Sequence, residues 1–283
     1  MEWKHHLPPA GGRIGRRQAL ALLATAASAP LGAATFGDTN VLFIGNSYST
    51  QMAAIFRTLS RAARKAGRIE ALTPGGLQLK AHLANGEAAR MIARGAWTHV
   101  VLQEQSQTAS FPEDQVRATT DPAVEGFRKL CATAKARPLL FWHWAKTGGD
   151  KDNFPGDTYE AQRDRLGATF ARLAREQGIT LVPAGKAWDQ VHRDHPDLDL
   201  YGPDGSHPSP AGSYLAACVC FAVIHGPESV ARLSAFPGAR DADAKILRDA
   251  ATKALAPNKS QMPQCWLAAA LSKAMPNKQQ TSA

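Results

Sequence analysis

The stretch NVLFIGNSYS at residues 40–49 decides how this chain folds. Its first half, Asn40–Gly45, is a nearly unbroken apolar run, which is typical of a strand buried on both faces of a parallel sheet. A helical pattern follows from about residue 50 to residue 66. Ligands bind α/β sheets beyond the carboxyl ends of the strands, where the turn Gly45-Asn46-Ser47 falls. The stretch therefore predicts a fold class and the position of a site.

Four more short apolar runs follow along the chain, separated by helical patterns. The further predicted strands are 68–73, 98–103, 138–144 and 179–183, and the further predicted helices are 86–94, 122–136, 158–177 and 210–224. Strands that are apolar throughout and alternate with helices argue for a parallel sheet covered on both faces. We therefore expect an α/β fold of three layers, α/β/α, around a parallel five-stranded sheet.

Length and composition agree with such a fold. The chain has 283 residues, of which 44% are hydrophobic and 20% charged, so fibrous, coiled-coil and wholly disordered classes are excluded. We expect residues 35–226 to form the α/β domain. Residues 227–283 are expected to form a helical C-terminal extension, with helices near 241–255 and 261–275 and a disordered end.

The first 34 residues have the pattern of an export signal. Arg16 and Arg17 precede an Ala-rich apolar run at 19–34, which Pro30 interrupts and which ends in small residues. A charged start, a short apolar run and small residues are the parts of a cleavable signal, and paired arginines are typical of the twin-arginine type. The run is shorter than the roughly 20 residues that span a bilayer. We expect a periplasmic or secreted protein that the export machinery recognises and that has no stable membrane anchor.

Charge and cysteines limit the partners. The formal charge of +9 is not organised into Lys/Arg runs with interleaved aromatics, so no nucleic-acid partner is predicted. Cys218 and Cys220 lie about 200° apart on a predicted helix and are not expected to bond each other. Cys265 bridges to one of them, or the cysteines, Cys131 included, stay free and buried. A CxxC pair is lacking, which argues against a zinc knuckle.

A second motif, YGPDGSHPSP at residues 201–210, can supply a base for Ser47. Asp204 precedes His207 by three residues on a Gly/Pro-rich loop, so it can fix the imidazole tautomer while His207 takes the serine proton. Two other interpretations are a turn with an incidental histidine and a metal site, although a third ligand at metal spacing is lacking. Ser47 could equally be a helix cap. We expect no metal and no organic cofactor.

Together the two motifs resemble those of the SGNH hydrolases, also called GDSL-type esterases and lipases. Gly45-Asn46-Ser47 matches the block around the nucleophile, and Asp204 to His207 matches the terminal Asp-x-x-His block. The ordinary α/β-hydrolases differ, because their Gly-x-Ser-x-Gly elbow lies mid-chain and their acid and histidine are far apart. The resemblance covers about residues 39–225 and implies the flavodoxin-like SGNH fold.

The resemblance also implies two further oxyanion donors besides the Ser47 N–H. The glycine after the second strand maps to Gly76. The asparagine block departs from the family pattern, since Gln103-Glu104-Gln105-Ser106 stands where Gly-x-Asn-Asp is expected. Position along the strand favours Gln105, while Gln103 projects to the same side and resembles the Gln-Gly-Glu block of some carbohydrate esterases. Either amide can donate to an oxyanion, and the choice stays open.

These expectations combine into an exported serine esterase with a triad of Ser47, His207 and Asp204 and an acyl-enzyme intermediate. Family resemblance implies short acyl esters, acetyl esters on carbohydrates among them, with Trp142 or Trp144 packing in the core or stacking on a sugar. The altered third block leaves an alternative, a non-catalytic carbohydrate-binding or cell-envelope protein. A metal-dependent phosphoesterase would be distinguished by its sensitivity to chelators.

Overall fold

A computed structural model describes residues 39–256, which contain one five-stranded sheet and eight α-helices. The strands are β1 (Thr39–Ile44), β2 (Ala66–Leu72), β3 (His99–Gln103), β4 (Arg137–Phe141) and β5 (Thr180–Val182). The helices are α1 (Ser47–Ala62), α2 (Leu79–Asn85), α3 (Glu87–Arg94), α4 (Glu113–Thr133), α5 (Tyr159–Gln177), α6 (Ala184–Asp194), α7 (Pro210–His225) and α8 (Asp241–Ala254). Two 3-10 turns, η1 (Thr108–Ser110) and η2 (Pro227–Arg232), complete the described elements.

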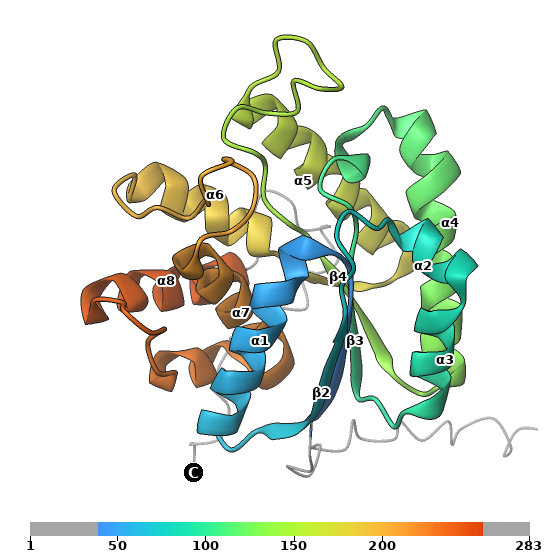
Figure 1. Ribbon diagram of the computed structural model, residues 1–283, viewed down its shortest axis with the longest axis horizontal. Helices are drawn as coiled ribbons and strands as arrows, with labels where there is room; N and C mark the ends of the chain where they lie inside the picture. Colours follow the sequence, from blue (N-terminus) through green and yellow to red (C-terminus); the bar gives the residue numbers. More distant parts are fainter. Residues whose placement is uncertain (1–38, 257–283) are drawn as a thin grey trace, which may run out of the picture. The chain divides into compact units, whose positions relative to one another are not determined.

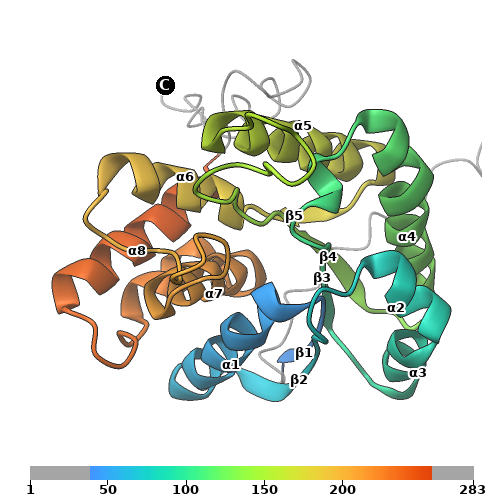
Figure 2. The same cartoon turned by 45° about the horizontal axis from the view of Figure 1, so that its top comes forward.

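Helices cover both faces of the sheet, as the sequence predicts (Figures 1 and 2). Alternate residues of β1 point to opposite faces, so Val41 and Phe43 join the core under α1, α6, α7 and α8, whereas Leu42 and Ile44 join the core under α2 to α5. Both sets are fully buried. The continuous apolar run that opens the chain's folded part is therefore required by the two cores on either side of it.

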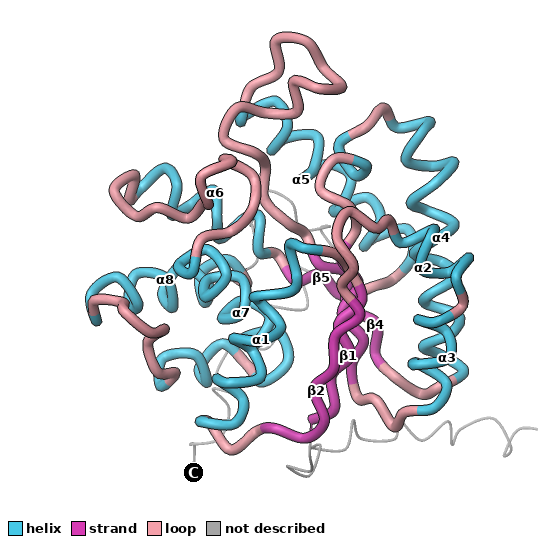
Figure 3. The backbone as a smooth tube through the Cα atoms, in the orientation of Figure 1, coloured by secondary structure: helices cyan, strands magenta, loops and turns pink. Residues whose placement is uncertain are grey.

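The strand order is β2-β1-β3-β4-β5 and all pairs are parallel. Figure 3 shows the sheet in magenta with helices on either side of it. Because β1 lies between β2 and β3, the loop after β1 is flanked by the loops that follow those two strands. The chain leaves β1 toward β2 and leaves β3 toward β4, in opposite directions along the sheet. The carboxyl ends of β1 and β3 therefore border the crevice in which open α/β sheets bind ligands. This order places the loops that carry Ser47, Gly76 and Gln105 next to one another.

Several element boundaries differ from the sequence prediction. Helix α4 begins at Glu113 and contains Pro122, so this proline lies inside a helix rather than at its start. The predicted helix at 86–94 is preceded by a second short helix, because Gly86, with φ +70°, ends α2 and starts α3. Helix α1 begins at Ser47, three residues earlier than predicted.

The C-terminal part of the described chain packs on the domain through α8. Its buried face joins the core that α6 and α7 line, and Lys186 Nζ donates to Ala254 O at 3.0 Å at the end of the helix. The cysteines at 131, 218 and 220 are buried and free. The predicted export signal, Cys265, the helix at 261–275 and the predicted disordered end lie outside the described residues. Between residues 39 and 256, no helix is long and apolar enough to cross a bilayer.

Candidate active site

The turn Gly45-Asn46-Ser47 makes Ser47 the first residue of α1. Asn46 caps the helix, since its Oδ1 accepts the backbone N–H of Tyr48 at 3.2 Å. Its Nδ2 donates to Leu77 O at 3.1 Å and so ties the turn to the loop after β2. Asn46 is buried while Ser47 is only half-buried. The hydroxyl of Ser47 is thus held at the positive end of a helix, within reach of a ligand.

The fold brings Ser47, His207 and Asp204 into one chain of hydrogen bonds. Ser47 Oγ lies 2.9 Å from His207 Nε2, across 160 positions of sequence. On the other side of the ring, His207 Nδ1 lies 2.5 Å from Asp204 Oδ2. Because a carboxylate only accepts, Nδ1 carries the proton and Nε2 is left to accept from the serine. This is the tautomer that a general base requires.

Asp204 is fixed by its second oxygen as well. Oδ1 accepts the backbone N–H groups of Ser206 at 3.0 Å and His207 at 2.9 Å. The hydrogen bond from His207, followed by these backbone bonds, lowers the pKa of Asp204 to about 2. The side chains of Asp204 and His207 are nevertheless 51% and 50% exposed. The carboxylate is therefore held by hydrogen bonds rather than by burial.

The loop that carries His207 is closed by its own backbone. Gly202 N donates to His207 O at 2.7 Å, and Tyr201 and Pro208 form an isolated antiparallel bridge. Gly205 adopts φ +65° and lies so close to Thr147 that a Cβ would overlap its hydroxyl. Ser209 then caps α7 by accepting the N–H of Gly212 at 3.1 Å. Backbone bonds within the loop, together with the contact of Gly205 with Thr147, thus set the geometry of Asp204 and His207.

Solved structures provide the comparison for this arrangement, since no protein-family model and no curated protein matches the sequence. A DUF4886 family protein from Bacteroides uniformis aligns with a TM-score of 0.67 and 20% identity over 77% of this chain and 95% of that one. A putative SGNH hydrolase from Slackia heliotrinireducens aligns with a TM-score of 0.54 and 27% identity over 65% and 97%. The chain has the SGNH-hydrolase fold.

A further solved structure with this SGNH fold is a catalytic mutant of Axe2, an acetylxylan esterase from Geobacillus stearothermophilus. It aligns with a TM-score of 0.51 and 15% identity over 68% of this chain and 97% of that one. The five-stranded parallel sheet and the flanking helices are therefore those expected from the resemblance of the sequence to SGNH hydrolases.

In this SGNH-fold protein, Gln103 at the end of β3 is hydrogen-bonded to the turn that carries Ser47. It is fully buried, and its Oε1 accepts Asn46 N at 2.9 Å and Ser49 Oγ at 2.8 Å. Its Nε2 donates to Glu104 O. A Cβ at Gly45 would overlap the Gln103 side chain, so the glycine gives the amide its room. The two bonds to Oε1 and the complete burial of the side chain make Gln103 a support of the turn.

The other two predicted donors lie in the loops on either side of Ser47. Gly76, in the exposed loop after β2, adopts φ +68°, and nothing lies within 4 Å of a Cβ built on it. Gln105 follows β3, and its Oε1 accepts Gln107 N at 2.8 Å and Thr108 N at 3.1 Å. Its Nε2 donates to Gln107 Oε1 at 3.2 Å. An amide nitrogen carries two hydrogens, so the second remains for a ligand.

Replacing Gln103 by leucine is expected to destabilise the fold and the site together. Two buried donors, Asn46 N–H and the Ser49 hydroxyl, would lose their acceptor, at a cost of about 1–3 kcal/mol each. The free energy of unfolding from urea denaturation should fall by about 2–6 kcal/mol. Esterase activity should fall at least tenfold as the turn relaxes.

Gln162→Leu is the matched control for this change. Gln162 is another fully buried glutamine whose Oε1 accepts a backbone N–H, that of Lys146, at 2.8 Å. We expect this variant to lose stability without a comparable loss of activity. If Gln103→Leu instead lost activity with unchanged stability, Gln103 would be an oxyanion donor and the supporting role would be wrong.

The two tryptophans that follow β4, Trp142 and Trp144, differ in burial. Trp144 is 1% exposed and lies stacked between Tyr48 and Trp188. Trp142 packs against Gly167 and Gly185, where an added Cβ would contact its ring. Trp144 therefore packs in the core, which is the first of its two expected roles. Trp142 is partly exposed and packs between α5 and α6.

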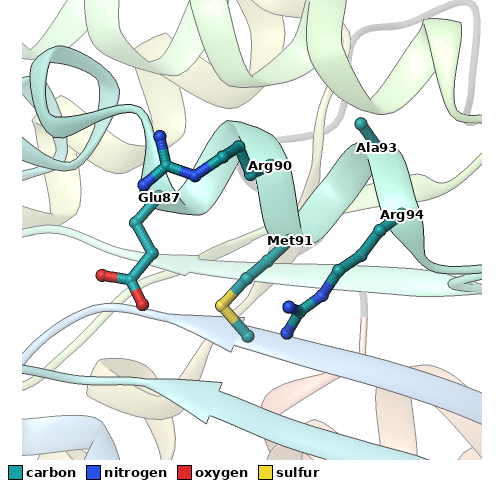
Figure 4. A pocket seen from close by; sticks show the side chains of 5 residues that line it. All are labelled: Glu87, Arg90, Met91, Ala93 and Arg94. Carbon is teal, nitrogen blue, oxygen red and sulfur yellow. The ribbon is translucent and has the colours of Figure 1, made fainter.

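A hollow elsewhere on the surface is separate from Ser47. It lies on α3 and is lined by Glu87, Arg90, Met91, Ala93 and Arg94 (Figure 4). Helix α3 packs on the face of the sheet opposite to α1. Within the described part of the chain, no three His, Cys, Asp or Glu side chains gather in a way that could hold a metal ion.

Proposed function

We propose that this chain is an exported serine esterase that hydrolyses short-chain acyl esters, with acetyl esters of carbohydrates as the leading substrate class. The observation that carries the proposal is the line of hydrogen bonds from Ser47 Oγ to His207 Nε2 and from His207 Nδ1 to Asp204. Nucleophile, base and orienting carboxylate have the mutual distances that acyl transfer requires before any substrate is bound.

The reaction follows from this geometry. His207 Nε2 takes the proton of Ser47 as its Oγ attacks the ester carbonyl, and Asp204 stabilises the imidazolium that forms. Collapse of the tetrahedral intermediate breaks the bond to the alcohol oxygen, which His207 protonates. Water then attacks the acyl-enzyme with the same histidine as base, and the carboxylic acid leaves.

The negative charge of the tetrahedral intermediate needs donors around Ser47. The first N–H groups of a helix have no intrahelical acceptor, and Asn46 Oδ1 takes up that of Tyr48, which leaves the N–H of Ser47 for the oxyanion. We assign the other two donors to Gly76 N–H and Gln105 Nε2. Strand order supports both assignments, because the loops after β2 and β3 flank the loop after β1.

Exposure of the site favours a bulky alcohol and a small acyl group. Half of the His207 side chain is open to solvent, and Gly75 and Gly76 are exposed. Polar side chains lie on both sides of the serine turn: Thr50 Oγ1 on α1 donates to Thr73 Oγ1 after β2 at 3.1 Å. An open, polar site suits an ester on a polymer surface, and the acetylxylan esterase of the same fold makes acetyl esters the first choice. The pattern at residues 1–34 adds export to the proposal.

The proposal is tested with the purified chain, p-nitrophenyl esters of two, four and eight carbons, and a fluorophosphonate probe. We expect the acetate to have the highest kcat/KM, activity to persist in excess chelator, and the probe to label one serine, identified as Ser47 by peptide mass spectrometry. Acetate release from acetylated xylan tests the carbohydrate substrate directly.

The opposite results distinguish the alternatives. Absence of labelling, with ester hydrolysis at the background rate, would favour a non-catalytic carbohydrate-binding protein on this fold. Activity abolished by chelator and restored by a divalent metal would favour a metal-dependent phosphoesterase. A preference for the eight-carbon ester would keep the serine esterase and overturn the short-chain assignment.

A further inference from the structure

Tyr48, the residue after the proposed nucleophile, is hydrogen-bonded to Ser206, the residue before the proposed base. Tyr48 OH lies 2.6 Å from Ser206 Oγ, so the pair 48–206 runs beside the pair 47–207. Ser106, in the loop after β3, places a second hydroxyl next to that of Tyr48. The Tyr48 hydroxyl therefore connects the start of α1 to the loop of His207 and to the loop after β3.

The tyrosine ring is held as firmly as its hydroxyl. It is 2% exposed and stacks on Trp144, with ring centroids 4.9 Å apart and planes at 5°. Trp144 in turn stacks on Trp188 at 3.9 Å, and its Nε1 donates to Ser206 O at 3.0 Å. Ser206 is thus bound by its side chain and by its carbonyl to two stacked aromatic rings that belong to the core.

His207 has few other restraints on the side that faces Ser47. Half of its side chain is in solvent, and the Asp204 bond holds only Nδ1. Asp204 lies on the same loop, so this bond fixes the ring relative to the loop but not relative to α1. The edge of the Tyr48 ring against the imidazole, at 5.4 Å and 69°, and the hydroxyl bond to Ser206 connect the loop to α1.

We propose that Tyr48 and Ser206 are positioning residues that hold the loop of His207 against the start of α1 and so keep the imidazole in reach of Ser47. This inference rests on the proposed esterase function and assigns to that site two residues that do not touch the reacting atoms. A displacement of about 1 Å in a catalytic group can cost up to roughly a hundredfold in rate.

Burial keeps this contact intact over the working pH range. It raises the pKa of Tyr48 to about 12, against the opposing effect of the hydrogen bonds from the two serines. The phenol therefore stays protonated and available for the bond to Ser206 wherever an esterase of this type operates. The contact is a fixed part of the site and not a titrating switch.

The test compares Tyr48→Phe, Ser206→Ala and the double variant with the unchanged chain. Ser206→Ala removes only the hydroxyl and keeps the backbone bonds to Asp204 and Trp144. For p-nitrophenyl acetate we expect kcat to fall about tenfold in Tyr48→Phe with KM within twofold, because substrate contacts are unchanged. The double variant should be no slower than Tyr48→Phe, since both changes remove the same bond.

Tyr214→Phe serves as the structural control. Tyr214 is another buried tyrosine on α7, whose hydroxyl donates to Ser234 O at 2.9 Å away from the loops of the site. We expect the two Tyr→Phe variants to lower the melting temperature by similar amounts, while only Tyr48→Phe lowers kcat and slows fluorophosphonate labelling of Ser47.

Two outcomes would overturn the inference in different ways. If the unchanged chain is active and labelled at Ser47, but Tyr48→Phe loses no more kcat than Tyr214→Phe, the hydroxyl stabilises only the fold and the esterase function stands. If the unchanged chain is neither active nor labelled, the proposed function fails and the positioning role fails with it.

Discussion

Replacing Ser47 by alanine is expected to lower kcat for acetyl-ester hydrolysis by about 10⁴-fold or more, because the bond-forming oxygen is removed. His207→Ala should be nearly as slow, since Ser47 Oγ then has no base at 2.9 Å to take its proton. The two residues act as one unit, so the double variant should be no slower than the worse single variant. Steady-state kinetics of the two single variants and the double variant, measured over the same range of substrate concentrations as for the unchanged chain, quantify these losses.

The folded state of these variants is the necessary control. Ser47 and His207 are partly exposed, so both changes should leave the melting temperature within a few degrees of the unchanged chain. Equal activity of the Ser47→Ala variant and the unchanged chain would rule out this serine as the nucleophile. Multiplicative losses in the double variant would show that the two residues do not act together.

Changing Asp204 to asparagine is expected to lower kcat by about 10³-fold while leaving the loop in place. Asparagine Oδ1 can still accept the N–H groups of Ser206 and His207, which Asp204 Oδ1 accepts now. Its amide nitrogen, however, would face Nδ1 of the ring as a donor, and the imidazole would take the tautomer with the proton on Nε2. That ring cannot accept the proton of Ser47, which is the cause of the loss.

Asp199→Asn is the matched control for this variant. Asp199 lies a few residues earlier, is exposed, and accepts the N–H of Tyr201 at 3.1 Å through Oδ1. An asparagine there keeps this bond and alters no tautomer, so activity should stay within twofold. A loss in Asp204→Asn no greater than in Asp199→Asn would mean that Asp204 does not orient His207.

The depressed pKa of Asp204 also sets a pH window. A carboxylate whose pKa is lower in the folded state than in the unfolded chain contributes stability above its unfolded pKa and loses it as the pH falls through the folded one. The pKa of Asp204 is about 2 in the folded state and about 3.9 in the unfolded chain. Its contribution to the free energy of unfolding is therefore full above roughly pH 5 and lost between about pH 4 and pH 2.

Urea denaturation of the unchanged chain and Asp204→Asn at several pH values checks this window. The difference in free energy of unfolding should be constant from about pH 5 upward and shrink toward zero near pH 2. It should be small throughout, because the Asp204 side chain is half exposed and solvent screens its interaction with His207. A difference that grew as the pH fell would contradict the assigned direction.

Some parts of the site are predictable from sequence because they are local. Asp204 and His207 lie three residues apart on a loop of glycines and prolines, and the bonds that orient them lie almost entirely within that loop. The third block is less local. The pattern predicts Gln103 and Gln105 equally as donors, and only the tertiary structure shows that Gln103 Oε1 accepts Asn46 N and Ser49 Oγ and so supports the turn.

Nothing in the sequence pattern indicates the proposed roles of Tyr48 and Ser206 except their positions beside Ser47 and His207. Their bond joins residues 158 positions apart, and periodicity carries no information on which loops face each other. The same limit applies to Trp144. Its place just after β4 is compatible with a wall of the site or with the core, and only its stacking on Tyr48 of α1 and Trp188 of α6 decides between them.

By itself, the sequence of this protein determined the sheet, the three layers and the chemistry of the candidate residues. Burial of a strand on two faces demands apolar residues in succession, and a proton relay demands a hydroxyl, an imidazole and a carboxylate. Tertiary structure alone shows the distance between Ser47 and His207, the bonds that each glutamine makes, and the bond between Tyr48 and Ser206. Those contacts depend on strand order and on the packing of helices far apart in the chain, and local sequence patterns do not specify either.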